Sequence, residues 1–117
     1  MKPETRFRKN QIDPFLKTLR IFVDSIQQVS IRGTPDYYLC IQGRFVALEI
    51  KWTGGRLSKL QIYRLGCIRD SGGIAICVTP ENWGEVKTLL TDLQRKGRVC
   101  PLKLNILMSQ EASFKIA

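Results

Sequence analysis

Two carboxylic acids and a lysine stand at the ends of neighbouring apolar segments, which is a pattern suited to binding a hard divalent cation. Asp36 opens one apolar segment, and Glu49 and Lys51 close the next. Side chains alternate between the two faces of a strand, so Glu49 and Lys51 point the same way. Mg²⁺ prefers oxygen ligands and keeps several waters. Asp36, Glu49 and the backbone carbonyl of Ile50 therefore form a candidate metal site.

The elements around these residues are predicted to bring them together. The apolar runs 37–42 and 44–52 predict two strands, and a tight turn at Gln42-Gly43 would pair them. Asp36 would then lie close to Glu49. A bound cation would neutralise charge on a phosphodiester and acidify an attacking water, while Lys51 would orient that water or stabilise the developing charge. The alternative is a surface salt bridge between Glu49 and Lys51, with Asp36 capping a turn.

The remaining pattern predicts an α/β fold, in which a small mixed β-sheet is flanked by helices. Ser58 is a good N-cap for a helix that runs to Asp70, and Ser71-Gly72-Gly73 ends it. The other predicted elements are a helix over 12–24, a short strand over 27–32, a buried strand over 74–79, a helix over 81–96 and a final edge strand over 102–108.

Length and composition indicate one globular domain, residues 1–117, with 44% hydrophobic residues. No apolar run is long enough to span a bilayer, and no apolar signal region follows the charged N-terminus, so a cytoplasmic location is expected. The four cysteines form no CxxC pair and suit a reducing compartment. Because the chain has no histidine, we expect neither the common zinc sites built from Cys and His nor a histidine-based catalytic triad.

The net charge of +9 favours a polyanionic partner, and nucleic acid is the first candidate. Arg56 and Lys59 follow the strand that carries Lys51, so we expect them to contact phosphates. A second basic group near the N-terminus contains Arg6, Arg8 and Lys9. Binding through such contacts should depend strongly on salt. A basic surface that serves only solubility is the alternative.

Four aromatic residues are candidates for stacking on opened bases. Packing in the core or at a subunit interface is the alternative that we expect more often. The residues are Tyr37, Tyr38, Trp52 and Tyr63.

The spacing of these motifs resembles the VRR-NUC family of the PD-(D/E)xK nuclease superfamily. The similarity covers about residues 30–80, and its motifs are Gly33-Thr34-Pro35-Asp36, Gly43-Arg44-Phe45, Glu49-Ile50-Lys51, Gly55-Arg56-Leu57-Ser58 and Gln61. The resemblance implies a restriction-endonuclease-like core. It also implies an endonuclease that depends on Mg²⁺ or Mn²⁺ and acts on branched DNA, with four-way (Holliday) junction resolution as the leading activity of small stand-alone members in phages and bacteria.

The resemblance also assigns roles to individual residues. Asp36 and Glu49 match the metal-binding acids, Ile50 the carbonyl ligand and Lys51 the catalytic lysine. Gln61 matches a glutamine near the site, on the helix that follows the core strands. Family members carry a further acid on the first helix, for which Glu4 is the better candidate and Asp13 the alternative.

The number of active sites bears on the expected assembly. One site per chain cannot cut two strands symmetrically, so junction resolution would require a homodimer. The alternative functions are a non-catalytic nucleic-acid-binding module and a subunit of a repair or restriction assembly that needs a partner.

Overall fold

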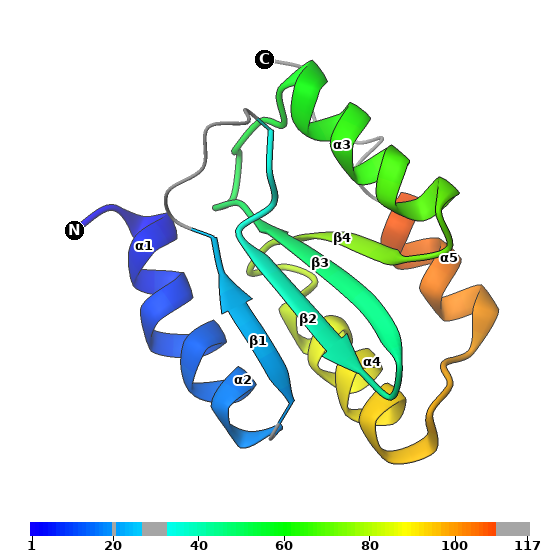
Figure 1. Ribbon diagram of the computed structural model, residues 1–117. Helices are drawn as coiled ribbons and strands as arrows, with labels where there is room; N and C mark the ends of the chain where they lie inside the picture. The colour runs from blue at the N-terminus through cyan, green and yellow to red at the C-terminus, as the bar shows by residue number, and fades with distance from the viewer. Residues whose placement is uncertain (20, 27–32, 110–117) are drawn as a thin grey trace.

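The computed structural model describes residues 1–19, 21–26 and 33–109 (Figure 1). The element order confirms the predicted mixed α/β class, with a four-stranded sheet flanked by helices. The elements are α1 (Pro3–Phe7), the π-helical turn η1 (Arg8–Ile12), α2 (Asp13–Thr18), β1 (Phe22–Ser25), β2 (Tyr37–Ile41), β3 (Arg44–Ile50), α3 (Lys59–Asp70), β4 (Ile74–Val78), α4 (Trp83–Lys96) and α5 (Pro101–Ser109).

The sheet has the strand order β1-β2-β3-β4. The β1–β2 and β2–β3 pairs are antiparallel, and β3 and β4 are parallel. The predicted turn between β2 and β3 is present, and Gln42 (φ 50°) and Gly43 (φ 76°) both adopt positive φ. Two such residues in a row match the right-handed twist of the strands that they join.

Helix α3 makes the crossover between the two parallel strands. Its predicted N-cap is confirmed, because the Ser58 hydroxyl accepts from the Gln61 amide and the Gln61 side chain accepts from the Ser58 amide. Gly72, with φ 92°, stands in the turn that ends the helix. Because β4 is buried along its whole length, the predicted continuous apolar strand is also confirmed.

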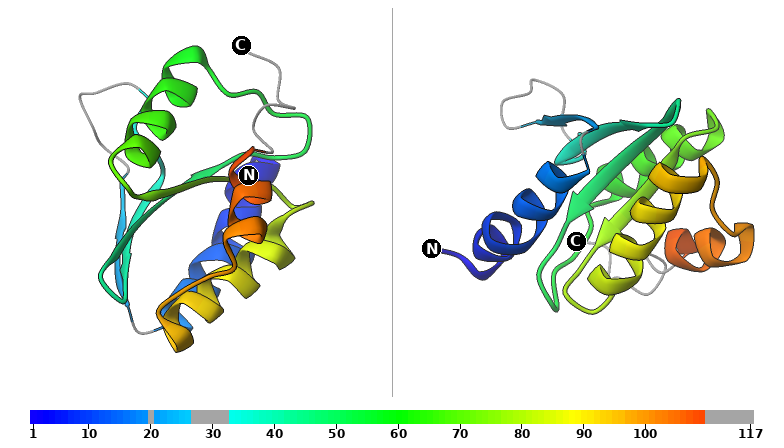
Figure 2. Two further views of the ribbon diagram at one scale, coloured as in Figure 1. Left: turned by 90° about the vertical axis from the view of Figure 1, so that its right-hand side faces the viewer. Right: turned by 90° about the horizontal axis from the view of Figure 1, so that it is seen from below.

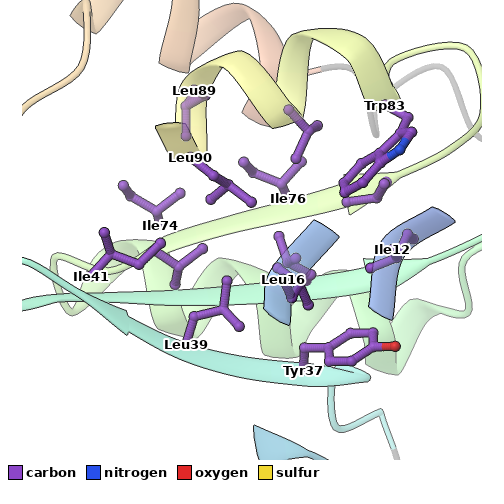
Figure 3. Close-up of a cluster of buried hydrophobic side chains, with 14 of the residues drawn as sticks. Ile12, Leu16, Tyr37, Leu39, Ile41, Ile74, Ile76, Trp83, Leu89 and Leu90 are labelled. Carbon is purple, nitrogen blue, oxygen red and sulfur yellow. The ribbon is translucent and has the colours of Figure 1, made fainter. Parts of the chain in front are cut away.

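The sheet separates two apolar layers. One face packs against α1, α2, α4 and α5, and the other face packs against α3 (Figure 2). The larger layer includes Ile12, Leu16, Leu39, Ile76 and Leu90 (Figure 3). Ala47, Leu65 and Ala75 belong to the smaller layer beneath α3. In the part of the chain that the structure describes, no helix combines the length and the apolar composition needed to cross a bilayer.

The N-terminal prediction of a helix over 12–24 is wrong at both ends. Helical structure begins at Pro3, and residues 22–25 form the strand β1. Ile21, Phe22 and Val23 are consecutive, so one helix face cannot bury all three. Pairing with β2 supplies backbone hydrogen bonds to this segment instead. The π-helical turn ends at Ile12, two residues before Pro14, whose nitrogen cannot donate to the carbonyl four residues earlier.

The predicted edge strand over 102–108 is also wrong, because this segment is the helix α5. Leu102 is 67% and Ile106 51% exposed, so the alternate apolar residues of this segment do not share a buried face. The residues that pack inward are Leu104, Leu107 and Met108, which have helical spacing. Pro101 suits the first helical turn. The predicted strand over 27–32 lies outside the described residues.

Candidate metal and phosphodiester site

The strand register places Asp36 across from Glu49. Tyr37 pairs with Leu48, so the same register continued by one residue sets the two acids opposite each other. The amide of Ile26 donates to the carbonyl of Asp36 at 2.8 Å, which continues the β1–β2 ladder past Asp36. Asp36 is therefore held between two neighbouring chain segments. Glu49 is only 5% exposed, since it lies on the face covered by α3.

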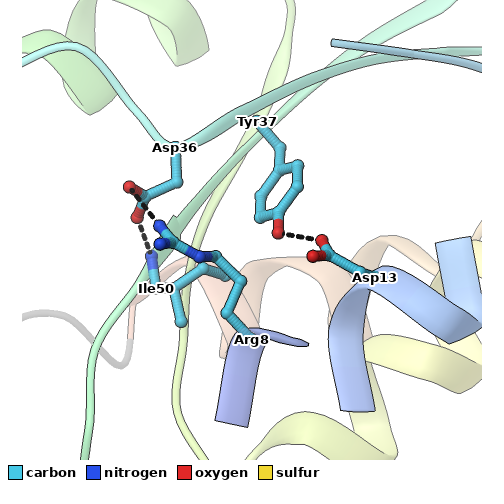
Figure 4. A network of polar contacts seen from close by, with 5 residues as sticks. All are labelled: Arg8, Asp13, Asp36, Tyr37 and Ile50. Atoms are coloured by element: carbon cyan, nitrogen blue, oxygen red, sulfur yellow. Dashed lines mark hydrogen bonds and ion pairs between the residues drawn. The ribbon is translucent and has the colours of Figure 1, made fainter. Parts of the chain in front are cut away.

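Two groups hold the carboxylate of Asp36. Its Oδ2 atom accepts a hydrogen bond from the backbone amide of Ile50 at 2.8 Å. Its Oδ1 atom lies 3.6 Å from Nη1 of Arg8 (Figure 4). The peptide unit of Ile50 therefore borders the acid pair. Asp36, at the start of β2, is thus held in a fixed position relative to the backbone at the end of β3.

The pKa of Glu49 is raised from 4.5 to about 9, and burial of the side chain is the largest cause. The negative charge of Asp36 and a hydrogen bond between the two carboxyl groups contribute to the increase, whereas the ammonium of Lys51 opposes it. Two carboxylates this close in a low-dielectric site cannot both ionise without a neutralising cation. Without a cation, the pair therefore holds a proton at neutral pH.

Lys51 follows β3 directly and faces the same side of the sheet as Glu49. Its amide donates to the Val78 carbonyl at 2.9 Å, which extends the parallel ladder beyond β3. The turn after it folds back over the lysine, so that a Cβ atom at Gly55 would lie 2.9 Å from the Trp52 carbonyl oxygen and 3.4 Å from Cβ of Lys51. Glycine at position 55 thus allows this turn to cover the lysine stem.

Gly33 positions the segment that leads into Asp36. It adopts a φ of 82°, and a Cβ atom there would lie 2.9 Å from Cγ and 3.0 Å from the carbonyl oxygen of Leu60. The Gly33-Thr34-Pro35-Asp36 segment therefore packs against the first turn of α3. This contact explains why the motif begins with glycine.

Helix α1 contributes to the same end of the sheet. Glu4 adds to the negative field that raises the pKa of Glu49. The buried ring of Phe7 packs edge-on against Trp52, with ring centroids 6.1 Å apart, so α1 is joined to the loop after β3. Asp13 instead accepts a hydrogen bond from the hydroxyl of Tyr37, whose pKa is raised mainly by burial and then by Asp13 (Figure 4).

The other residues predicted for the site have varied positions. Gln61 uses its side-chain oxygen in the capping box of α3, 2.9 Å from the Ser58 amide nitrogen. Four of the predicted phosphate contacts are exposed side chains, namely Arg6, Lys9, Arg56 and Lys59. The fifth, Arg8, is instead the half-buried partner of Asp36. The sequence predicted no helix over residues 4–8, so no local pattern indicated this ion pair between segments distant in sequence.

The donor atoms at this end of the sheet fit a small hard cation. Asp36 and Glu49 offer carboxylate oxygens, and Mg²⁺ often takes one or two carboxylates and completes its shell with water. No cluster of three or more His, Cys, Asp or Glu side chains arranged to hold a metal occurs among residues 1–19, 21–26 and 33–109. Such a site would thus depend on two acids, backbone oxygen and water.

No protein-family model matches the sequence, and no curated protein resembles it closely enough to count as a match.

Proposed function

We propose that this chain is a metal-dependent endonuclease of the VRR-NUC type that hydrolyses phosphodiester bonds in DNA. The observation that supports the proposal most directly is the buried Glu49 opposite Asp36, with Lys51 on the same face at the end of β3. Burying one acid beside another is unfavourable for folding. A pair kept in this arrangement is therefore better explained by a cation that it binds than by stability.

In this proposal Asp36 and Glu49 hold Mg²⁺ or Mn²⁺, together with the carbonyl of Ile50. The ion would supply charge neutralisation at the phosphate and a more acidic water. Lys51 stabilises the negative charge that develops on the phosphate oxygens. The amide of Ile50 and the guanidinium of Arg8 orient Asp36, since both contact its carboxylate. Glu4 adds negative charge near Glu49, which favours a cation there.

The proposed substrate is branched DNA, and the proposed assembly is a homodimer that resolves four-way junctions. The net charge of +9 supports a polyanionic substrate. Exposed Arg56 and Lys59 stand in the loop after Lys51 and in the first turn of α3, where they would contact phosphates next to the cut. Two-fold symmetry would supply one active site for each of the two strands cut at a junction.

The test is a cleavage assay on end-labelled four-way junction, flap, linear duplex and single-stranded DNA, with Mg²⁺, Mn²⁺ or EDTA. Asp36→Asn and Glu49→Gln should each lower the cleavage rate by at least about a hundredfold, because each removes a charged ligand. Asp70→Asn, at an exposed acid near the end of α3, is the matched control and should cut normally. Normal cleavage by Asp36→Asn would refute the site, and DNA binding without any cleavage would favour a partner-dependent or inactive subunit.

A further inference from the structure

The sheet face beneath α3 carries rows of cross-strand neighbours that lead away from the acid pair. The β1–β2 and β2–β3 registers define these rows, and partners in a row point to the same face. Successive rows are two residues, or about 7 Å, apart along the strands. From the acid pair toward the β2–β3 turn, the rows are Asp36 with Glu49, Asp24 with Tyr38 and Ala47, and Phe22 with Cys40 and Phe45.

The part of this face on β1, on β2 and at the start of β3 is open. Helix α3 buries Ala47 and Cys77 on β3 and β4, whereas Phe22 is 65% and Phe45 43% exposed. Cys40 is exposed, and Phe22 and Phe45 are its two cross-strand neighbours. Tyr38 is half-buried, and its ring lies 5.1 Å from that of Phe45. We call Phe22, Tyr38, Cys40 and Phe45 the aromatic sheet face.

A pocket of about 420 Å³ separates the aromatic sheet face from α3. Tyr38 and Phe45 line it on the sheet side, and Arg64 and Cys67 line it on the helix side. The pocket therefore combines aromatic rings with one guanidinium. It begins one row away from Asp36 and Glu49, on the same face of the sheet.

We propose that the aromatic sheet face binds unpaired bases of the DNA strand whose phosphate lies at the acid pair. This inference rests on the proposed nuclease function. It identifies unpaired bases as the feature of the DNA substrate that the nuclease would recognise. Every base has a π-face that can stack on an aromatic ring, but bases inside a duplex are already stacked on each other. The substrate is therefore DNA with unpaired nucleotides beside the cut, such as an open branch point or a flap.

The charges around the aromatic sheet face indicate how such a strand would lie. Arg64 stands on the α3 side of the pocket and would contact the backbone phosphates. Asp24 lies at the outer edge of the middle row, where a carboxylate disfavours phosphate. Bases would thus lie on Tyr38 and Phe45, with phosphates along α3.

Thiol footprinting tests the inference without any need for cleavage. Full-length Asp36→Asn protein in EDTA is treated with N-ethylmaleimide, and the modification rate of each cysteine is followed by mass spectrometry. A saturating single-stranded oligothymidylate should slow modification of Cys40 at least about tenfold, and a blunt duplex should not. Cys100, which is exposed beside α5, is the internal control and should react at an unchanged rate.

Variants of the exposed rings provide a second test, by fluorescence anisotropy. Phe45→Ala and Phe22→Ser should each weaken binding of the single strand by roughly five- to a hundredfold, and leave duplex binding unchanged. Leu102→Ser, at an exposed apolar residue of α5, should bind like the parent chain. Phe22 is largely exposed, so its variant is expected to fold even if Phe45→Ala does not.

The possible outcomes separate this inference from the proposed function. Protection of Cys40 by the single strand, together with a parent chain that cuts none of the DNA substrates in Mg²⁺ or Mn²⁺, would support the aromatic sheet face and refute the nuclease. Cleavage of branched DNA with Cys40 unprotected would overturn the inference alone. Protection that depends on protein concentration in the absence of DNA would also overturn it, because it would assign this face to a second copy of the chain.

Discussion

Arg8 and Asp36 form an ion pair with 3.6 Å between Nη1 and Oδ1, and both side chains are about three-quarters buried. The arginine comes from the π-helical turn and the acid from the start of β2, so the pair joins the N-terminal helices to the sheet. It also puts a permanent cation beside one of the two proposed metal ligands. If the site binds a divalent ion as proposed, Arg8 would weaken that binding.

We expect Arg8→Gln to tighten Mn²⁺ binding by roughly three- to tenfold. Removing a positive charge next to the site lowers the repulsion that the incoming ion meets. Isothermal titration calorimetry with Mn²⁺ measures the change, and Arg95→Gln on α4 is a control at an exposed arginine. If Arg8→Gln instead weakened Mn²⁺ binding, the main role of Arg8 would be to hold Asp36 in place.

Metal binding at neutral pH should release about one proton, because the acid pair holds one when no cation is present. The raised pKa of Glu49, about 9, predicts that metal affinity increases with pH up to that value. Calorimetric titrations of the protein with the metal ion at pH 7, in two buffers with different ionisation enthalpies, measure the number of protons released. The binding heats differ between the buffers in proportion to that number. Equal heats in both buffers would argue against release from Glu49.

The stability of the metal-free protein should fall as pH rises from about 5 to 9. The pKa of Glu49 is near 4.5 when exposed and about 9 when folded, so the folded state binds the extra proton over this range. The stabilisation that this proton provides is complete below the unfolded pKa of 4.5. It is lost as the pH rises through the folded pKa of about 9. Urea denaturation in EDTA at pH 5, 7 and 9 should show a flatter pH dependence for Glu49→Gln. The exposed Glu85→Gln control should run parallel to the parent chain.

Gly33→Ala should destabilise the fold by about 1–3 kcal/mol, because alanine is strained at positive φ and its Cβ would meet Leu60. Gly66→Ala is the matched control. Gly66 lies within α3, and a Cβ atom there would meet nothing within 4 Å. Gly66→Ala should raise the free energy of unfolding by roughly 0.5–1 kcal/mol, because alanine has a higher helix propensity than glycine. Urea denaturation measures both changes, and equal stability of the two variants would contradict the close packing at Gly33.

Much of the candidate site could be predicted because its signals are local. The Gln42-Gly43 turn sets the register of β2 and β3, and this register alone places Asp36 opposite Glu49. Strand alternation then puts Lys51 on the face of Glu49. The Ser58 and Gln61 capping box starts α3 at the predicted residue.

The tertiary structure decided what these local signals left open. The sequences of residues 22–25 and 102–108 are compatible with both helix and strand. The segments that pack against them make the first a strand and the second a helix. The burial of Glu49 beneath α3 and the ion pair of Arg8 with Asp36 also join segments distant in sequence. Turn type, capping and alternation depend on residues a few positions apart, so the sequence determined them by itself. Burial and charge pairing depend on which segments meet in space, which only the folded chain determines.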